Sequence, residues 1–177
     1  MTSDESLRYP IGCSPKAESI TLEERIAAIE GIRQLPQALR KAIAPLSEEQ
    51  LETPYRPGGW TVRQLIHHVA DSHMNAYNRV RLALTEDWPT IFAYKEERWA
   101  ELADARTENV STSLDLLQSL HVRWVRLFSS LDEQEWKRGF LHPAMGRQSV
   151  EQSVMLYDWH GRHHTAHVTR LSQRMGW

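Results

Sequence analysis

The stretch from Val110 to Leu131, "VSTSLDLLQSLHVRWVRLFSSL", carries the clearest secondary-structure pattern in this sequence. Its apolar residues, with one histidine among them, recur at spacings of three and four, which indicates one face of an α-helix with 3.6 residues per turn. We therefore expect this helix to line a core. The face consists of Val110, Leu114, Leu117, His121, Trp124, Phe128 and Leu131.

Three further segments, residues 21–46, 61–87 and 150–175, show the same helical spacing. Each is introduced by a capping box, in which a Ser or Thr and a Glu or Gln three residues later bond to the first free amides of a helix. No segment shows the alternation of a strand, so we predict an all-α four-helix bundle without a sheet. The capping pairs are Thr21 with Glu24, Thr61 with Gln64, and Ser149 with Gln152.

Prolines and glycines predict where the helices are interrupted. Residues 1–18 contain two prolines and a glycine among polar residues, which predicts an extended N-terminal arm, and residues 19–177 then form the bundle domain. Pro36 should kink or split the first long helix. The connection 88–109 is long enough to contain structure of its own, with a short helix expected around residues 96–102.

The overall composition narrows the classes of function. Lys and Arg total 21 against 23 for Asp and Glu, giving a net charge of -2 with no long run of either sign, so nothing suggests nucleic-acid binding. No signal segment and no window of ~18 apolar residues is present, so we expect a soluble cytoplasmic protein. Cys13 is the only cysteine, so any metal ion must be held by histidine or carboxylate.

The stretch "YDWHGRHHTAHV", residues 157–168, contains four of the nine histidines. On a helical wheel, His164 lies about 40 degrees from the apolar line, His160 about 80, His167 about 100 and His163 about 140. His160 and His164 form the inward pair, one turn apart, as in HxxxH metal sites. His163 and His167 share the spacing but are expected to face outward. The alternative is that these histidines only make a helix surface polar.

A metal site needs a third protein ligand, because catalytic zinc commonly takes three and leaves a position for water. On the helix predicted for residues 61–87, His67 points away from the apolar line, His68 lies at its flank and His73 lies close to it. Periodicity rejects His67 but does not choose between His68 and His73. A buried His73 or His121 could also be an ordinary hydrogen-bonded interior histidine. His142, in a loop, carries no positional information.

Several other catalytic motifs are absent. Gly161, not glutamate, follows His160, so the sequence lacks the HExxH pattern and its adjoining general base. It also lacks a GxSxG elbow, a phosphate-binding loop and a GxGxxG fingerprint. Metal binding by histidine is therefore the main chemical hypothesis.

Four blocks, "YPIG", "TPYRPGGWTVRQLIHHVADSHMNAYNRVRLALTED", "LHVRWVRLF" and "WHGRHHTAHVTRLSQRMGW", resemble the YfiT group of metal-dependent hydrolases in the DinB superfamily, over Tyr9 to Trp177. The resemblance implies a DinB-like four-helix bundle, a homodimer and one divalent metal ion, zinc or nickel, per subunit. In that superfamily the first ligand follows a Trp-Ser/Thr pair and precedes an apolar-x-Asp stretch, which here is His68 before "VAD". The other two ligands lie in the last HxxxH, here His160 and His164.

The resemblance also implies an activity on a small-molecule substrate. Three neutral imidazoles leave the ion fully charged, which lowers the pKa of a bound water to about 7 and provides a hydrolytic nucleophile. The same ion could bind a thiol, as in the bacillithiol or mycothiol S-transferases of the superfamily, and a non-catalytic metal-binding bundle is a third alternative. Asp71 and Asp158 are candidates to orient an imidazole. Many members have Gln where this chain has His167, so His167 is a further candidate for the site.

Overall fold

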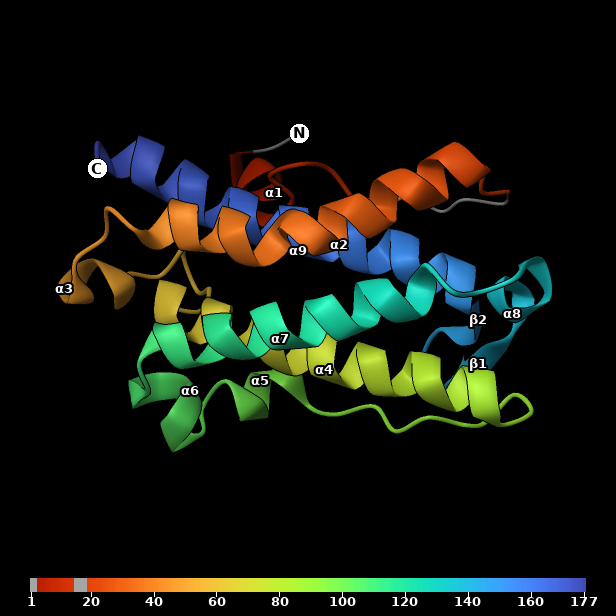
Figure 1. Cartoon of the computed structure of the whole chain (residues 1–177). Helices are drawn as coiled ribbons and strands as arrows, with labels where there is room; N and C mark the ends of the chain where they lie inside the picture. Colours follow the sequence, from red (N-terminus) through yellow and green to blue (C-terminus); the bar gives the residue numbers. More distant parts are fainter. Residues whose placement is uncertain (1–2, 15–18) are drawn as a thin grey trace.

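The computed structural model describes residues 3–14 and 19–177, and four long helices pack side by side in it as a bundle (Figure 1). They are α2 (Leu22–Ile43), α4 (Val62–Thr85), α7 (Val110–Phe128) and α9 (Val150–Met175). The predicted four-helix bundle is confirmed. Each of α2 and α4 packs against both α7 and α9, so α2 lies diagonally across the bundle from α4. The long connections make this order possible.

The sequence sets the helix boundaries largely as predicted. Thr21, Thr61 and Ser149 each form a complete capping box at the start of α2, α4 and α9. The helix α2 continues through Pro36, however, so the predicted split is absent. Proline has no amide hydrogen, and the carbonyl of Ile32, four residues earlier, therefore lacks its usual partner within the helix. The buried packing of α2 against α7 and α9 keeps the helix in one piece.

Short elements connect the long helices. They include α3 (Glu48–Leu51), α5 (Glu96–Trp99), α6 (Ala103–Thr107) and α8 (Glu133–Lys137), and α5 confirms the helix expected in the long connection. The strands β1 (Gly139–His142) and β2 (Gly146–Ser149) pair as an antiparallel hairpin, so the prediction of no sheet is wrong.

The hairpin escaped the sequence prediction for a physical reason. Each strand has four residues, which is too short for an alternating pattern to be recognised. The strand β1 is also fixed from outside, since Leu141 donates to the Pro89 carbonyl at 2.9 Å and accepts from the Ile91 amide at 3.0 Å. These backbone bonds join segments about fifty residues apart and leave no local trace in the sequence.

Residues 3–8 of the N-terminal arm are helical where an extended arm was predicted. The helix α1 (Ser3–Arg8) precedes the first proline, so its backbone is free to form helical hydrogen bonds. The rest of the predicted arm includes residues 1–2 and 15–18, which lie outside the described residues. The arm reaches α9, where the Tyr9 ring lies 6.3 Å from the ring of His163.

A layer of histidines divides the interior of the bundle into two apolar clusters. One cluster is built around Trp124 and Phe128, and the other around Leu39 and Leu65. Between them lie His73 and His121, with 0% and 1% of their surface exposed, followed by the histidines of α9. No helix in the described part of the chain is long and apolar enough to cross a lipid bilayer.

Candidate metal site

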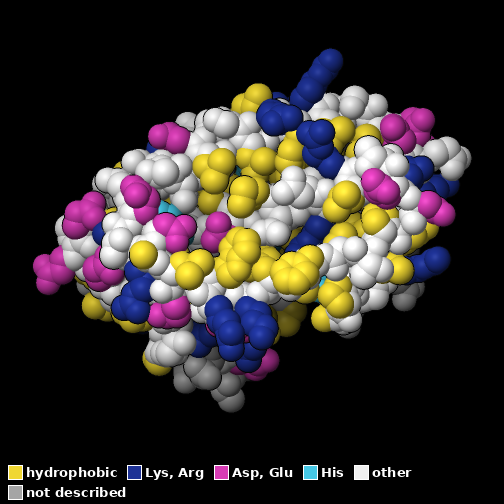
Figure 2. Space-filling view, turned by 90° about the horizontal axis from the view of Figure 1, so that it is seen from below, with side chains coloured by type: hydrophobic (Ala, Val, Ile, Leu, Met, Phe, Trp, Pro, Cys, Tyr) yellow, Lys and Arg dark blue, Asp and Glu magenta, His cyan; other side chains and the backbone are white. Residues whose placement is uncertain are grey.

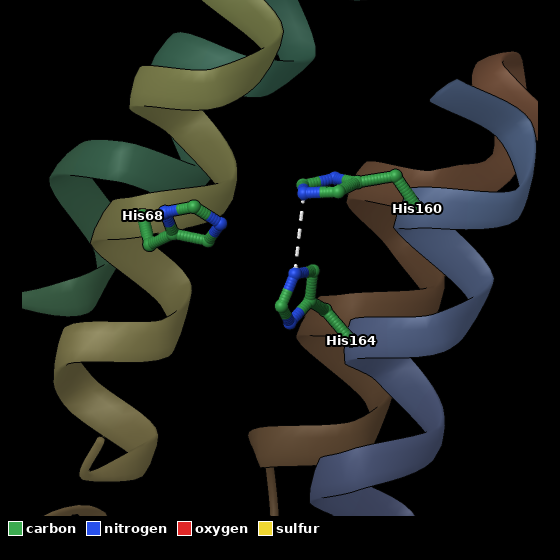
Figure 3. A group of neighbouring side chains, drawn as sticks. All are labelled: His68, His160 and His164. Atoms are coloured by element: carbon green, nitrogen blue, oxygen red, sulfur yellow. Dashed lines mark hydrogen bonds between the residues drawn. The ribbon is translucent and has the colours of Figure 1, made fainter. Parts of the chain in front are cut away.

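Three histidines converge between α4 and α9. Figure 3 shows His160 and His164 extending from α9 toward His68 on α4. The Nε2 atoms of His160 and His164 are 3.2 Å apart, and the ring centres of both lie 5.4 Å and 5.0 Å from that of His68. One nitrogen from each ring lies within 4.8 Å of the other two. The structure thus brings together His160 and His164, which the helical wheel placed inward, and His68, which the family resemblance implied.

The protein environment keeps these three imidazoles neutral. Burial lowers the pKa of His68 to about 4 and lowers the pKa of His160 and His164 well below the usual value, and neighbouring histidines lower the last two further. Neutral imidazole is the form that coordinates a metal ion. Three neutral nitrogen donors on two packed helices match the ligand set of a catalytic zinc site, which keeps a further position open. The residues present therefore fit a divalent metal ion.

His163, His167 and His67 were predicted to face outward, and all three predictions are wrong, because each of these residues is buried. His163 is 8% exposed and stacks on Trp159 with ring centres 4.5 Å apart. His67 is 6% exposed, and its Nδ1 and Nε2 lie 2.7 Å from Ser113 Oγ and 3.1 Å from the Glu108 carbonyl oxygen. The helical wheel assumes solvent opposite the core, but other segments cover these faces.

A second group of three histidines, His163, His164 and His167, also has nitrogens within 4.8 Å of one another. The Nε2 atoms of His163 and His167 are 3.0 Å apart, and burial lowers the pKa of these residues to about 4 and about 3. The Tyr55 ring packs on His167 at 4.2 Å between centres. All three members come from α9, and His164 belongs to both groups. His167 therefore lies near the site without joining His68.

His73, the alternative to His68, is not one of the converging ligands. Its Nδ1 lies 3.0 Å from His121 Nε2, and its Nε2 lies 3.2 Å from His160 Nδ1. His121 Nδ1 in turn lies 2.6 Å from the carbonyl oxygen of Ile32. Sequence reasoning treated His73 and His121 separately as interior histidines and missed their connection to His160. The only feature of the sequence that could have indicated this connection was the inward position of His73 and His121 on two predicted helices.

The two candidate carboxylates have other surroundings. Asp158 forms an ion pair with Arg162, with 2.6 Å between Oδ2 and Nη2. Burial is the main reason that the pKa of Asp71 is raised to about 6, and the negative charge of Asp104 adds to this shift. Among the described residues, neither carboxylate bonds to an imidazole of the three-histidine group. Within the described residues, the outer nitrogen of His160 lies instead 3.2 Å from His73 Nε2.

A cleft of about 310 Å³ adjoins His68, His160 and His164. Arg79 and Glu96 form the charged part of the cleft. Burial raises the pKa of Glu96, and the negative charge of Glu97 raises it further, whereas the positive charge of Arg79 partly offsets this shift. Such a cleft suits a small molecule with an apolar body and a polar group. Its apolar wall consists of Trp60, Phe140, Met145, Leu156 and Trp159.

The fold and the histidine group together define the class of protein. Residues 32–168 match the DinB superfamily, and the chain therefore belongs to this superfamily. A solved structure, YfiT from Bacillus subtilis, superposes with a TM-score of 0.95 at 48% identity, covering 97% of this chain and 99% of the other. YfiT is described as a probable metal-dependent hydrolase with an unusual four-helix bundle topology.

Two sequence relatives support the same grouping. Proteins from Bacillus cereus and Bacillus thuringiensis are each 53% identical over 171 residues, covering 97% of this chain and 98% of the relative. Both carry the name "Putative metal-dependent hydrolase". The similarity to the YfiT group predicted from the sequence is confirmed, and the histidine group is compatible with the metal dependence in these names.

Proposed function

We propose that this protein is a metal-dependent hydrolase whose His68, His160 and His164 bind one divalent ion, zinc or nickel. The observation that carries the proposal is the convergence of three neutral imidazoles, with 3.2 Å between His160 Nε2 and His164 Nε2, at the wall of a cleft. When bound, such an ion lowers the pKa of a coordinated water to about 7 and so supplies hydroxide at neutral pH.

The residues of the cleft would bind and orient the substrate. The Trp60 ring packs beside His68 with 4.5 Å between centres, which limits the access of bulk water to that ligand. Arg79 lies on the cleft wall and donates from Nη2 to the Phe92 carbonyl at 3.1 Å, which leaves further N–H groups of its guanidinium for a carboxylate or carbonyl of the substrate. Burial raises the pKa of Tyr157, although Arg79 and Ser72 oppose the shift, so its hydroxyl stays protonated and can donate to the substrate.

Elemental analysis and activity assays test this function directly. We expect protein purified without chelator or affinity tag to contain zinc or nickel and to hydrolyse activated esters or amides. His160→Ala should lose both the metal and the activity. Turnover that requires a low-molecular-weight thiol and an electrophile would instead establish the S-transferase alternative. Bound metal without either activity would support the non-catalytic alternative.

We further propose that the protein forms a homodimer. Figure 2 shows hydrophobic side chains across the face that contains α4 and the long connection. Phe92 in that connection is 82% exposed, and Leu82 and Leu102 are also exposed large hydrophobic residues. Apolar surface of this kind is favourable for a protein interface. Sedimentation equilibrium should give twice 20.6 kDa at micromolar concentration, and a single species of 20.6 kDa would rule the dimer out.

A further inference from the structure

A continuous chain of hydrogen bonds crosses the bundle and ends at one of the proposed ligands. It runs from His160 Nδ1 to His73 Nε2 at 3.2 Å, from His73 Nδ1 to His121 Nε2 at 3.0 Å, and from His121 Nδ1 to the Ile32 carbonyl oxygen at 2.6 Å. Each of the four long helices contributes one member. The two middle members are almost completely buried, so no water competes for their nitrogens.

The carbonyl group gives this chain a direction. A carbonyl oxygen only accepts, so His121 Nδ1 must carry the hydrogen. His121 and His73 are 1% and 0% exposed, and a charge is costly at such depth, so both rings are neutral and His121 Nε2 accepts from His73 Nδ1. By the same rule, the neutral His73 accepts at Nε2 from His160 Nδ1. His160 therefore carries its hydrogen on Nδ1, and its Nε2, which faces His164 across 3.2 Å, keeps a free lone pair.

Pro36 explains why the Ile32 carbonyl is available. In a regular α-helix this oxygen would accept from the amide of residue 36, but proline has no amide hydrogen. The carbonyl can therefore accept a strong hydrogen bond from His121 Nδ1, consistent with the short separation of 2.6 Å. The proline that interrupts the hydrogen bonding of α2 thus anchors the far end of the histidine chain.

His164 has no comparable support. Its Nδ1 is buried without a hydrogen-bond partner among the described residues. The hydrogen bond between His160 Nε2 and His164 Nε2 in the metal-free protein needs one hydrogen. Because His160 Nε2 carries a lone pair, this hydrogen is on His164 Nε2. The two ligands of the HxxxH pair therefore differ, since His160 is prepared for a metal ion and His164 must give up its Nε2 hydrogen when the ion binds.

We propose that His73 and His121 are positioning residues which, anchored by the Ile32 carbonyl, hold His160 in the tautomer that presents an unprotonated Nε2 to the metal ion. This inference rests on the proposed metal site. Its physical basis is that a ligand already in the correct tautomer and orientation needs no rearrangement on binding. Loss of such an outer partner typically lowers metal affinity about 10- to 100-fold.

The tautomer can be observed in the metal-free protein. Two-bond ¹H–¹⁵N correlation spectra of the full chain in chelator should show the hydrogen of His160 on Nδ1 and that of His164 on Nε2. Assignment comes from the spectra of the His160→Gln and His164→Gln variants. A wild-type spectrum with the hydrogen of His160 on Nε2 would overturn the proposal. This readout does not depend on any activity.

Variants at His121 test the effect on metal affinity. In competition with a chelator, His121→Leu should bind Zn²⁺ about 10- to 100-fold more weakly and show both His160 tautomers. His121→Gln keeps an acceptor for His73 and should recover much of the affinity. His67→Leu is the matched control, because it removes a buried, hydrogen-bonded histidine of α4 that does not reach His160. It should bind Zn²⁺ like the wild type.

Pro36→Ala tests the anchor without removing a histidine. The new amide competes with His121 for the Ile32 carbonyl, so Zn²⁺ should bind more weakly although α2 gains a helical hydrogen bond. Wild-type Zn²⁺ affinity in both His121→Leu and Pro36→Ala would refute the proposal. A wild-type protein that binds no Zn²⁺ or Ni²⁺ would refute the proposed function instead, and the spectra would still decide whether the chain fixes the tautomer.

Discussion

The helix α9 carries two histidine pairs that look equivalent and differ in what surrounds them. His160 with His164 and His163 with His167 are both four residues apart, with Nε2 atoms 3.2 Å and 3.0 Å from each other. The first pair faces a third histidine on another helix and has an outer hydrogen-bonded chain. The second pair packs against aromatic rings such as Tyr55.

The difference between the pairs shows what spacing alone cannot establish. Both pairs have the HxxxH pattern, both are neutral, and both have a third nitrogen within 4.8 Å. Only the first pair has its third nitrogen on another helix, since His68 belongs to α4. Its nitrogen donors therefore approach a bound ion from two sides. His163 Nδ1 and His164 Nδ1, one from each pair, are both buried without a partner among the described residues, so the pairs differ in the bond from His160 Nδ1 to His73. This difference supports our proposal that the metal ion binds at the first pair.

Removing a ligand of the first pair should give the largest effect. His160→Ala and His164→Ala each delete a direct coordinate bond, so Zn²⁺ affinity should fall by more than the roughly 100-fold upper value for outer partners. Titration calorimetry of the metal-free variants measures the loss. Affinity within a few-fold of wild type in either variant would show that the wrong pair has been chosen.

Acid should destabilise the metal-free protein through both pairs alike. Burial lowers the folded-state pKa of these histidines and also that of His68 and His121, both to about 4. Between about 4 and the unfolded value near 6.5, the unfolded chain binds more protons, so stability decreases as pH falls through this window. Each such histidine contributes up to about 1.4 kcal/mol per pH unit. Urea unfolding in chelator at several pH values measures the slope, and a flat profile would contradict this expectation.

Gly161 lies between the two pairs and should affect them together. A Cβ atom there would lie 2.5 Å from Leu35 Cδ2, so Gly161→Ala forces a side chain of α2 to move. Overpacking of this kind typically costs about 1 to 3 kcal/mol, and the higher helix propensity of alanine offsets roughly 1 kcal/mol. We expect a decrease of a few degrees in the melting temperature. An unchanged melting temperature would mean that α2 and α9 adjust freely.

Changes in the second pair should have the smallest effect on metal binding. His163→Ala removes no nitrogen from the group formed with His68, so Zn²⁺ affinity should stay within a few-fold of wild type and the stoichiometry should remain one ion per chain. Calorimetry and elemental analysis give both quantities. A large loss of affinity in His163→Ala, or two ions per wild-type chain, would remove the distinction between the pairs.

The sequence predicted the elements that depend on local chemistry. Capping boxes and helical spacing gave the four long helices because both effects act within a few residues. The same spacing placed His160 and His164 toward the interior, and family resemblance selected His68. Periodicity alone could not choose between His68 and His73, since both lie on the inner half of α4 and only packing against α9 separates them.

Three of the differences from the sequence prediction share a physical cause, because each depends on contacts between distant segments. His67 was assigned to solvent, but Ser113 and Glu108, more than forty residues away, cover it. The hairpin β1–β2 is fixed by backbone bonds to residues near Pro89. Pro36 was expected to kink or split the first long helix, and tertiary packing keeps this helix in one piece. A helical wheel has no information on what covers its polar side.

The histidine layer between the two apolar clusters has a consequence for how uniquely the chain folds. Apolar side chains tolerate alternative packings, whereas a buried donor or acceptor without a partner costs about 1 to 3 kcal/mol. Ile32, His73, His121 and His160 satisfy one another only when their four helices have this neighbour order and this vertical alignment. A bundle with two helices exchanged, or with one helix shifted by a turn, would leave several of these groups buried without a hydrogen-bond partner. The layer thus disfavours competing folds, in the way that a buried polar residue fixes the register of a coiled coil.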